Sequence, residues 1–385
     1  MRMDMDPLQQ WFFSVRERKL PGYPHEFIYM TGHGRPDVTI ADVVPEGLDP
    51  DFRLTWSEEW YGSAALRQRV LDTYQHAGLD IEHVLISHGT NAANYVAMQG
   101  LLEPGDEVVL QVPSWMQAYM VTTHVLRCQV TLLRTTPEDG WRIDLDRLRG
   151  LVSDRTRMIW IVSPSNPTGM VITEAEMQGV VDIARSSGAW VLHDAGHRGL
   201  EWDGGLAPAV VDLYERGVTT GGTTKALGVT GLRIGWIISR DKGLIRSCNT
   251  IQTYITLCTS WPGEALATRL LEPETFRRVI EGGKATGRRN RALFEAWLAR
   301  HPERVGWVRP AGSYLGFPGY RYDVGSWDLC ERALGQKVVL APGAGFLTEG
   351  HFRIGFGLET PRFAEGLSRM DALLADLDGT GRQTP

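Results

Sequence analysis

The chain has 385 residues, about two to three times the usual size of one domain, so its length favours two domains or one large α/β body with an additional lobe. Hydrophobic residues make up 43% and charged residues 22%, a composition that excludes a collagen, a coiled coil and a disordered tail. Forty Lys and Arg against 46 Asp and Glu give a net charge of −6, which offers no basic surface to a nucleic-acid backbone. We therefore expect no nucleic-acid partner.

The amino-terminal sequence and the cysteines indicate a cytoplasmic location. The opening MRMDMDPLQQWFF alternates acidic with apolar residues and lacks the apolar core of a secretory signal. No apolar run approaches the length of a membrane span, so we expect no membrane partner. The cysteines stand far apart, with no Cys-x-x-Cys and no matching His pair, which predicts reduced thiols and no metal site. They are Cys128, Cys248, Cys258 and Cys330.

Short apolar runs alternate with helical patterns through the middle of the chain and predict the strands of one sheet. They are Val84 to Ser87, Glu107 to Gln111, Met158 to Val162, Trp190 to His193 and Arg233 to Ile238. Amphipathic stretches between such runs favour a mainly parallel sheet with helices on both faces, a doubly wound α/β core. The Pro- and Gly-rich segment from Gly32 to Pro50 is interpreted as an ordered connection.

The pattern changes from about Ala265 onward. A long charged helical stretch continues through Arg300, and short strand-like segments follow it. These segments are Gly306 to Arg309, Val338 to Ala341 and His351 to Phe356. The sequence therefore predicts a second, smaller α+β lobe.

Polar or aromatic residues follow the first three predicted strands, where ligands collect in α/β sheets. His88-Gly89-Thr90-Asn91 opens a helix whose free N–H groups suit a phosphate, although an ordinary turn has the same pattern. Trp115 can stack on a flat ring or belong to the core. Asn166 lies in a turn fixed by two prolines and a glycine, Ser163 to Gly169.

The next two sites carry opposite charges. Asp194 ends an apolar strand, and a buried carboxylate requires a cation or a protonated nitrogen opposite it. Lys225 follows Gly221-Gly222-Thr223-Thr224 and precedes Gly231 to Gly235. A surface lysine needs no such glycine-rich approach, so solvation alone explains this residue poorly.

In this order, the motifs resemble the fold-type I pyridoxal-phosphate enzymes of the aspartate aminotransferase superfamily, from about Thr31 to Phe356. The resemblance rests on the Asn166 turn, Asp194, Lys225, Arg233 eight residues later, and Arg353 after a Pro342-Gly343 turn. It implies an α/β fold of the PLP-dependent transferase type I and a homodimer whose sites lie at the subunit interface. It also implies a large domain at 36–265 and a small domain formed by 1–35 and 266–385.

The resemblance assigns a role to each of these residues around pyridoxal 5′-phosphate. Lys225 is expected to bind the cofactor aldehyde covalently and to shuttle protons, and Asp194 to keep the pyridine nitrogen protonated. Trp115 is expected to stack on the ring and Asn166 to donate to its phenolate oxygen. The residues expected to bind the cofactor phosphate are Gly89, Thr90, Asn91, Thr224 and Arg233. Arg353 is expected to bind the substrate carboxylate, with Asn166 and Gly34 beside it.

Three departures from the family pattern affect the expected reaction. His197 stands where aminotransferases usually have a Tyr bonded to the phenolate oxygen, and its charge is adjustable near neutral pH. Gly222 replaces a phosphate-binding Ser or Thr, so we expect Thr224 and Arg233 to contribute more of the contacts to the phosphate. The Tyr usually sent to the phosphate by the neighbouring subunit has no clear counterpart. Neutral drift in an ordinary aminotransferase also explains these departures.

A narrower resemblance points to a different reaction. Pro7 to Phe12, Leu227 to Trp236, and Arg309 to Gly312 leading to Phe317-Pro318 resemble capreomycidine synthase-like enzymes, which act on hydroxylated arginines. This implies elimination of a side-chain hydroxyl and ring closure by the guanidine, in antibiotic-type metabolism. A guanidinium needs carboxylates or aromatic faces around it. The acidic candidates are Glu17, Glu26, Asp37, Glu201 and Asp203, each of which also fits a solvated surface acid.

His33 and His197 are the candidate catalytic acids or bases. His33 lies between two glycines and is placed to expel a hydroxyl or to cap a loop. The alternatives to cyclisation are an aminotransferase, an arginine oxidase and a non-catalytic effector sensor. A sensor of this kind carries an amino-terminal DNA-binding module, and only about 30 residues precede Gly32 here. Among these reactions, the narrower resemblance favours elimination with cyclisation of a hydroxylated arginine, and the aminotransferase is the main alternative.

Overall fold

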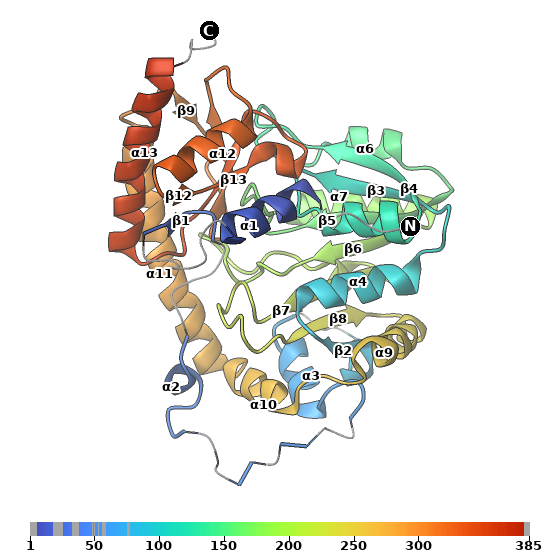
Figure 1. Ribbon diagram of the computed structural model, residues 1–385. Coiled ribbons are helices and arrows are strands. Elements are labelled where there is room, and N and C mark those ends of the chain that lie inside the picture. Colours follow the sequence, from blue (N-terminus) through green and yellow to red (C-terminus); the bar gives the residue numbers. More distant parts are fainter. Residues whose placement is uncertain are drawn as a thin grey trace.

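The computed structural model describes residues 6–17, 26–32, 38–47, 49, 51–52, 54–55, 59–74 and 78–380. Its centre is a seven-stranded sheet of order β2-β8-β7-β6-β5-β3-β4 (Figure 1). All strands run parallel except β8, which is antiparallel to β2 and β7. The strands are β2 (Val84–Ser87), β3 (Glu107–Val112), β4 (Gln129–Arg134), β5 (Thr156–Val162), β6 (Trp190–Asp194), β7 (Gly217–Gly222) and β8 (Gly235–Ser239). The predicted α/β fold with a mainly parallel sheet is confirmed.

Two strands of this sheet were not predicted, and one predicted strand is displaced. β7 reads Gly-Val-Thr-Thr-Gly-Gly and has no apolar run, while the edge strand β4 is largely exposed. Arg233 was assigned to a strand, but it precedes β8 with a positive φ of 53°. Threonine and glycine hide β7 from a hydrophobicity pattern, although the strand is buried along its whole length.

Helices cover both faces of the sheet, which explains why the inner strands are continuously apolar. Side chains of β5 alternate between two clusters: Met158 and Trp160 pack with α4 and α9, and Ile159 and Ile161 pack with α6, α7 and α8. On the first side lie α4 (Thr90–Leu101), α5 (Gln117–Met120), the π-helical turn η2 (Val121–Val125) and α9 (Lys242–Thr256). On the second lie α6 (Leu145–Leu151), α7 (Glu174–Ser187) and α8 (Val210–Leu213).

The predicted helical stretch from about Ala265 to Arg300 is confirmed, and it is divided into two helices. They are α10 (Trp261–Leu270) and α11 (Pro273–Leu298), and Pro273 stands at the start of α11. Proline lacks an N–H and is suited to a first helical turn, whereas it would interrupt a continuous helix. Near α10 lie α2 (Ile40–Val43), α3 (Ala64–Leu71) and the 3-10 turn η1 (Ile81–His83) next to α3.

The second lobe combines helices with short strands, as predicted. Its 3-stranded sheet has the order β10-β14-β13, and β1, near the amino terminus, pairs in parallel with β12. The helices are α1 (Pro7–Glu17), α12 (Ser326–Gly335), α13 (Thr360–Thr380) and the 3-10 turn η3 (Gly343–Phe346). The strands are β1 (Ile28–Tyr29), β9 (Val305–Gly306), β10 (Leu315–Gly316), β11 (Gly319–Tyr320), β12 (Val338–Val339), β13 (Ala341–Pro342) and β14 (Phe352–Gly355).

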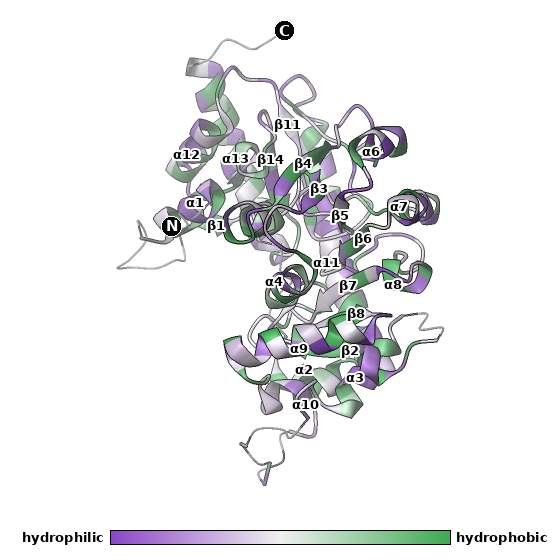
Figure 2. Ribbon diagram, turned by 90° about the vertical axis from the view of Figure 1, so that its right-hand side faces the viewer, coloured by the Kyte–Doolittle hydropathy of each residue, from purple (hydrophilic) through white to green (hydrophobic). Residues whose placement is uncertain are grey.

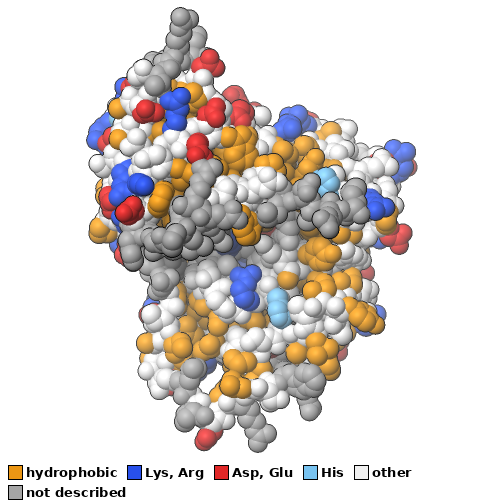
Figure 3. Space-filling model, viewed as in Figure 1, with side chains coloured by type: hydrophobic (Ala, Val, Ile, Leu, Met, Phe, Trp, Pro, Cys, Tyr) orange, Lys and Arg blue, Asp and Glu red, His pale blue; other side chains and the backbone are white. Residues whose placement is uncertain are grey.

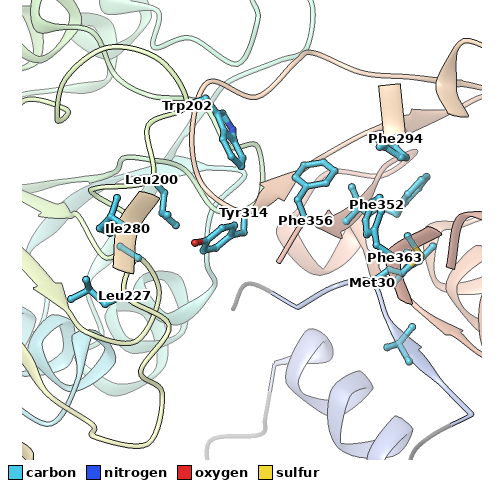
Figure 4. Close-up of a cluster of buried hydrophobic side chains, with 14 of the residues drawn as sticks. Met30, Leu200, Trp202, Leu227, Ile280, Phe294, Tyr314, Phe352, Phe356 and Phe363 are labelled. Carbon is cyan, nitrogen blue, oxygen red and sulfur yellow. The ribbon is translucent and has the colours of Figure 1, made fainter. Parts of the chain in front are cut away.

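One apolar cluster joins this lobe to the region around the sheet. Figure 4 shows Phe294 of α11, Phe352 of β14, Phe356 and Phe363 grouped on one side, and Leu200 and Leu227 on the other. In Figure 2, helices such as α6 and α7 carry both green apolar and purple polar residues, as amphipathic helices that cover a sheet do. Within the described ranges, no helix is long and apolar enough to cross a membrane.

Candidate active site

A cavity of about 380 Å³ opens where the carboxyl ends of β5, β6 and β7 meet the second lobe. Figure 3 shows the face of the molecule that Figure 1 also shows. A basic side chain and a histidine side chain lie next to each other near the middle of that face, below the upper lobe. The described lining residues are Gln9, Phe12, Phe13, Tyr29, Thr31, Gly32, Thr90, Asn91, Trp115, Val162, Asn166, Asp194, Gly196, His197, Lys225 and Arg353. The structure thus brings eight of the predicted site residues to one cavity.

Lys225 follows β7 and reaches the cavity from the loop after Gly222. Burial, with added repulsion from Arg353 and Arg233, lowers the pKa of Lys225 to about 7. A large fraction of its amine is therefore uncharged at neutral pH, and an uncharged amine is the form that attacks an aldehyde or accepts a proton.

Asp194 lies at the carboxyl end of β6 and is held by two donors. Gly196 N donates to Oδ1 at 2.9 Å, and Asn94 Nδ2 donates to Oδ2 at 2.8 Å. Asn94 is itself fixed by Thr220, whose hydroxyl donates to Asn94 Oδ1 at 2.5 Å. Burial raises the pKa of Asp194, against the effect of these hydrogen bonds. A protonated ring nitrogen in the cavity would supply the positive charge that this buried carboxylate requires.

The start of α4 and the loop before β8 form a cradle for an anion. Gly89 caps α4 with a φ of 81°, and a Cβ there would lie 2.6 Å from Nη2 of Arg233. Arg233 Nη1 donates to the hydroxyl of Thr224 at 3.2 Å. The buried hydroxyl of Thr90 has no hydrogen-bond partner among the described residues. An unpaired hydroxyl and a guanidinium at a helix amino terminus fit a phosphate group.

Thr90 also accounts for Gly222, the position where the family usually has a Ser or Thr. A Cβ at residue 222 would lie 2.6 Å from Thr90 Oγ1. The space of the usual hydroxyl is therefore filled by Thr90, which comes from α4. The hydroxyl of Thr90 therefore adds to the contribution expected from Thr224 and Arg233.

Asn166 and Arg353 meet on the other side of the cavity. Arg353 is 1% exposed and donates through Nη1 to Asn166 Oδ1 at 2.9 Å. Its Nη2 donates to the backbone oxygen of Thr31 at 3.0 Å and to the Thr31 hydroxyl at 3.1 Å. Burial lowers the pKa of Arg353 to about 9. No carboxylate in the described part of the chain pairs with this guanidinium, so a substrate carboxylate fits there.

His197 and Trp115 complete the described lining at the sheet edge. His197 is buried, and its Nδ1 lies 2.9 Å from the hydroxyl of Ser313. Burial and then the charge of Arg353 lower the pKa of His197 to about 3, so the imidazole is neutral at physiological pH. Trp115 is half-buried and also lines the cavity, and its flat indole ring is of the type that stacks on aromatic rings.

Other sequence candidates do not reach this cavity or cannot be placed. His33, Gly34 and Asp37 lie outside the described residues, as does the side chain of Glu17. Glu201 is buried away from the cavity and accepts from Gly199 N and Ala207 N at 2.9 Å. Neither Glu26 nor Asp203 is among the described lining residues.

Three residues with a clear place in the site were missed from the sequence. Asn94 follows Thr90 by four residues on α4, a helical spacing that could have revealed it. Thr31 and Ser313 carry no such signal, because their partners Arg353 and His197 are 322 and 116 residues away in the chain. Only the tertiary fold brings these pairs together.

The donor set of this cavity fits pyridoxal 5′-phosphate. Lys225 offers an uncharged amine for the aldehyde, Asp194 a buried carboxylate for the pyridine nitrogen, and Thr90 with Arg233 an anion cradle for the phosphate. In the part of the chain that the structure describes, no group of His, Cys, Asp and Glu forms a metal site.

The fold and the site define an enzyme of the pyridoxal-phosphate type. The sequence model of the family described as aminotransferase class I and II matches residues 53–370. The chain therefore belongs to the class I and II aminotransferase family, whose members use pyridoxal phosphate.

Individual relatives carry two kinds of name. Aspartate aminotransferase from Thermotoga maritima is 27% identical over 307 residues, which cover 76% of this chain and 76% of the relative. Capreomycidine synthase from Streptomyces vinaceus is 31% identical over 291 residues, 74% of this chain and 72% of the relative. The solved structure of the PLP-dependent cyclase OrfR is 25% identical, with a TM-score of 0.85 and 98% of each chain covered.

Proposed function

We propose that this enzyme eliminates a side-chain hydroxyl from a hydroxylated arginine and closes a ring with the guanidine. The observation that carries the proposal is His197, which replaces the usual Tyr in a chain 31% identical to capreomycidine synthase. It lines the cavity as a buried, neutral imidazole. The similarity to a solved structure named as a PLP-dependent cyclase supports a ring closure.

Bound pyridoxal phosphate supplies an electron sink for the carbanion formed when the substrate α-proton leaves. In the proposed mechanism Arg353 binds the α-carboxylate and orients the Cα–H bond. Lys225 Nζ takes the α-proton, which its pKa of about 7 permits at neutral pH. Asp194, fixed by Asn94, keeps the proton on the ring nitrogen.

In the remaining steps the substrate loses one water in total and no other atoms. The α-proton taken up by Lys225 and the side-chain hydroxyl sum to one water lost. A guanidine N–H then adds across the resulting double bond, with its nitrogen bonding to one carbon of that bond and its hydrogen to the other. Phe12, Phe13 and Tyr29 are among the lining residues, and aromatic rings can contact a guanidinium through cation–π interactions. Phe12 already lies 5.9 Å from the Arg353 guanidinium.

A specific observation favours the second candidate, an aminotransferase. Among the described lining residues the only carboxylate is Asp194, which the cofactor requires. A guanidinium therefore meets no acidic partner in this part of the cavity, whereas an apolar or aromatic amino acid would fit the lining. The relative from Thermotoga maritima is named as an aspartate aminotransferase.

Mass spectrometry of products separates these reactions. The cofactor-loaded enzyme is given arginine and its β- and γ-hydroxylated forms, with and without 2-oxoglutarate. A product lighter than its hydroxylated substrate by one water, formed without keto acid, supports cyclisation. Strict dependence on the keto acid overturns it in favour of amino transfer, and dependence on O₂ with arginine itself indicates an oxidase. Lys225→Ala is the matched inactive control, and the absence of any turnover in the wild type indicates a sensor.

A further inference from the structure

A buried serine from the second half of the chain contacts His197. Ser313 is 0% exposed and precedes β10, whereas His197 follows β6. The Ser313 hydroxyl and Nδ1 of His197 are 2.9 Å apart, a normal hydrogen-bond distance. Ser313 therefore connects the second lobe directly to His197.

The backbone on both sides holds this pair in register. Leu200 N donates to His197 O at 3.1 Å, and Ser313 N donates to Leu200 O at 2.9 Å. Gly312 N donates to Gly169 O at 2.8 Å, which also ties the segment to the Asn166 turn. Leu200 and Tyr314, the chain neighbour of Ser313, lie close together in Figure 4. These backbone hydrogen bonds thus fix the position of the Ser313 backbone relative to that of His197.

The direction of the hydrogen bond follows from the cost of burying an unpaired donor. His197 Nδ1 is the one partner of the Ser313 hydroxyl within the described ranges. If the hydroxyl accepted from Nδ1–H, its own buried O–H would have no acceptor there, which costs about 1 to 3 kcal/mol. If it donates to Nδ1, its donor is satisfied. A neutral imidazole that accepts at Nδ1 carries its proton on Nε2.

The backbone of Ser313 indicates that the side chain is held in place under strain. Its φ is 69°, in the left-handed region where glycine fits without cost and other residues lose about 1 to 2 kcal/mol. A strained, buried hydroxyl with a single partner is an arrangement typical of a functional site.

We propose that Ser313 is a positioning residue whose hydroxyl donates to Nδ1 of His197, which keeps the ring proton on Nε2 and makes His197 a hydrogen-bond donor rather than a base. This role rests on the proposed function only in so far as His197 lines the cofactor site. It is independent of whether the enzyme cyclises or transfers an amino group.

Two variants separate the hydroxyl from the backbone. Ser313→Ala and Ser313→Gly both remove the hydroxyl, but only glycine relieves the strain at a φ of 69°. We expect Ser313→Gly to unfold at a higher temperature than Ser313→Ala. An effect of the hydroxyl appears equally in both variants, whereas an effect of the backbone differs between them.

The tautomer of His197 is read by nitrogen NMR of the full-length protein with ¹⁵N-labelled histidine, with and without pyridoxal phosphate. The His197 signals are those lost in His197→Asn. We expect the wild type to hold the proton on Nε2, and both Ser313 variants to lose this preference to the same extent. A proton on Nδ1 in the wild type, an unchanged tautomer in the variants, or a difference between the variants overturns the role.

Cofactor affinity gives a second readout that does not depend on turnover. We expect both Ser313 variants to bind pyridoxal phosphate about 3- to 10-fold more weakly than the wild type, the effect of one hydrogen bond. Equal affinity in all three proteins contradicts a positioning role. If the wild type binds no pyridoxal phosphate, the proposed function fails, while the NMR result without cofactor still decides the role of Ser313.

Discussion

The immediate surroundings of single side chains in this site determine their positions and their protonation states. Thr90 fills the space next to Gly222, and Arg233 lies against Gly89, so two glycines and two polar side chains form one anion cradle. His197 is neutral because it is buried and lies near the positive charge of Arg353. The same burial leaves Lys225 with a pKa of about 7. Desolvation is thus the shared cause of both protonation states.

Acid should destabilise the protein through His197. Its pKa is about 3 in the folded state and 6.5 ordinarily, so below pH 6.5 the unfolded chain takes up a proton that the folded protein does not. This contribution to the free energy of unfolding is complete above pH 6.5. It is lost as the pH falls from 6.5 towards 3, by at most about 1.4 kcal/mol per pH unit.

Chemical denaturation at pH 7.5 and pH 5 checks this expectation in the wild type and in His197→Asn. The variant should lose less stability between the two pH values, while the other histidines contribute equally to both proteins. Equal losses in the two proteins would show that His197 is not buried in its neutral form.

At the scale of elements, α4 and β14 each connect parts of the site. One helix carries Thr90 and Asn91 in its first turn and Asn94 in the next, so the anion cradle and the orientation of Asp194 depend on the same backbone. β14 carries Arg353, and its Gly355 N donates to Met30 O at 2.5 Å. This contact holds the segment that brings Thr31 to Arg353.

Gly355→Ala should therefore damage both stability and substrate binding. A Cβ at residue 355 would collide with the backbone of Gly32, which cannot give way as a flexible side chain does. We expect a loss of about 1 to 3 kcal/mol in the free energy of unfolding, and a raised KM as Thr31 moves away from Arg353.

Gly306→Ala is the matched control for this substitution. Gly306 also lies in a short strand of the second lobe, β9, but a Cβ there would meet no atom within 4 Å. Its stability should stay within about 0.5 kcal/mol of the wild type. Denaturant titration of both variants tests the difference, and equal behaviour would contradict the close packing of β14 on the amino-terminal segment.

At the scale of the whole molecule, the site lies between the large sheet and the second lobe. The division into a large domain at 36–265 and a small domain from the two chain ends stays a prediction. The homodimer stays a prediction as well, and the surface offers a place for it. Figure 3 shows apolar side chains gathered over the lower part of the face where α9 and α10 lie. Tyr254, Ile255 and Leu257, at the end of α9, are 89%, 54% and 38% exposed.

A second copy of the chain is expected to cover this end of α9. Light scattering should give twice the 42.9 kDa mass of one chain. The double substitution Tyr254→Glu with Ile255→Glu should shift the protein towards the monomer, since it places charges in an apolar interface. Leu293→Glu on α11, at a residue that is 37% exposed, is the control and should leave the mass unchanged. A dimer that resists the double substitution would place the interface elsewhere.

The sequence by itself determined the α/β class, the order of the site motifs and the cofactor. These depend on apolar runs and on short motifs whose residues are close in the chain, such as Thr224-Lys225 and the Asn166 turn. Other features depend on contacts between residues far apart in the chain. The threonine- and glycine-rich β7 is a strand because both its neighbours pair with it. The hydroxyl of Thr90 fills the space beside Gly222, and the hydroxyl of Ser313 contacts the imidazole of His197. No local pattern encodes such contacts, because burial and close approach arise only once the chain has folded.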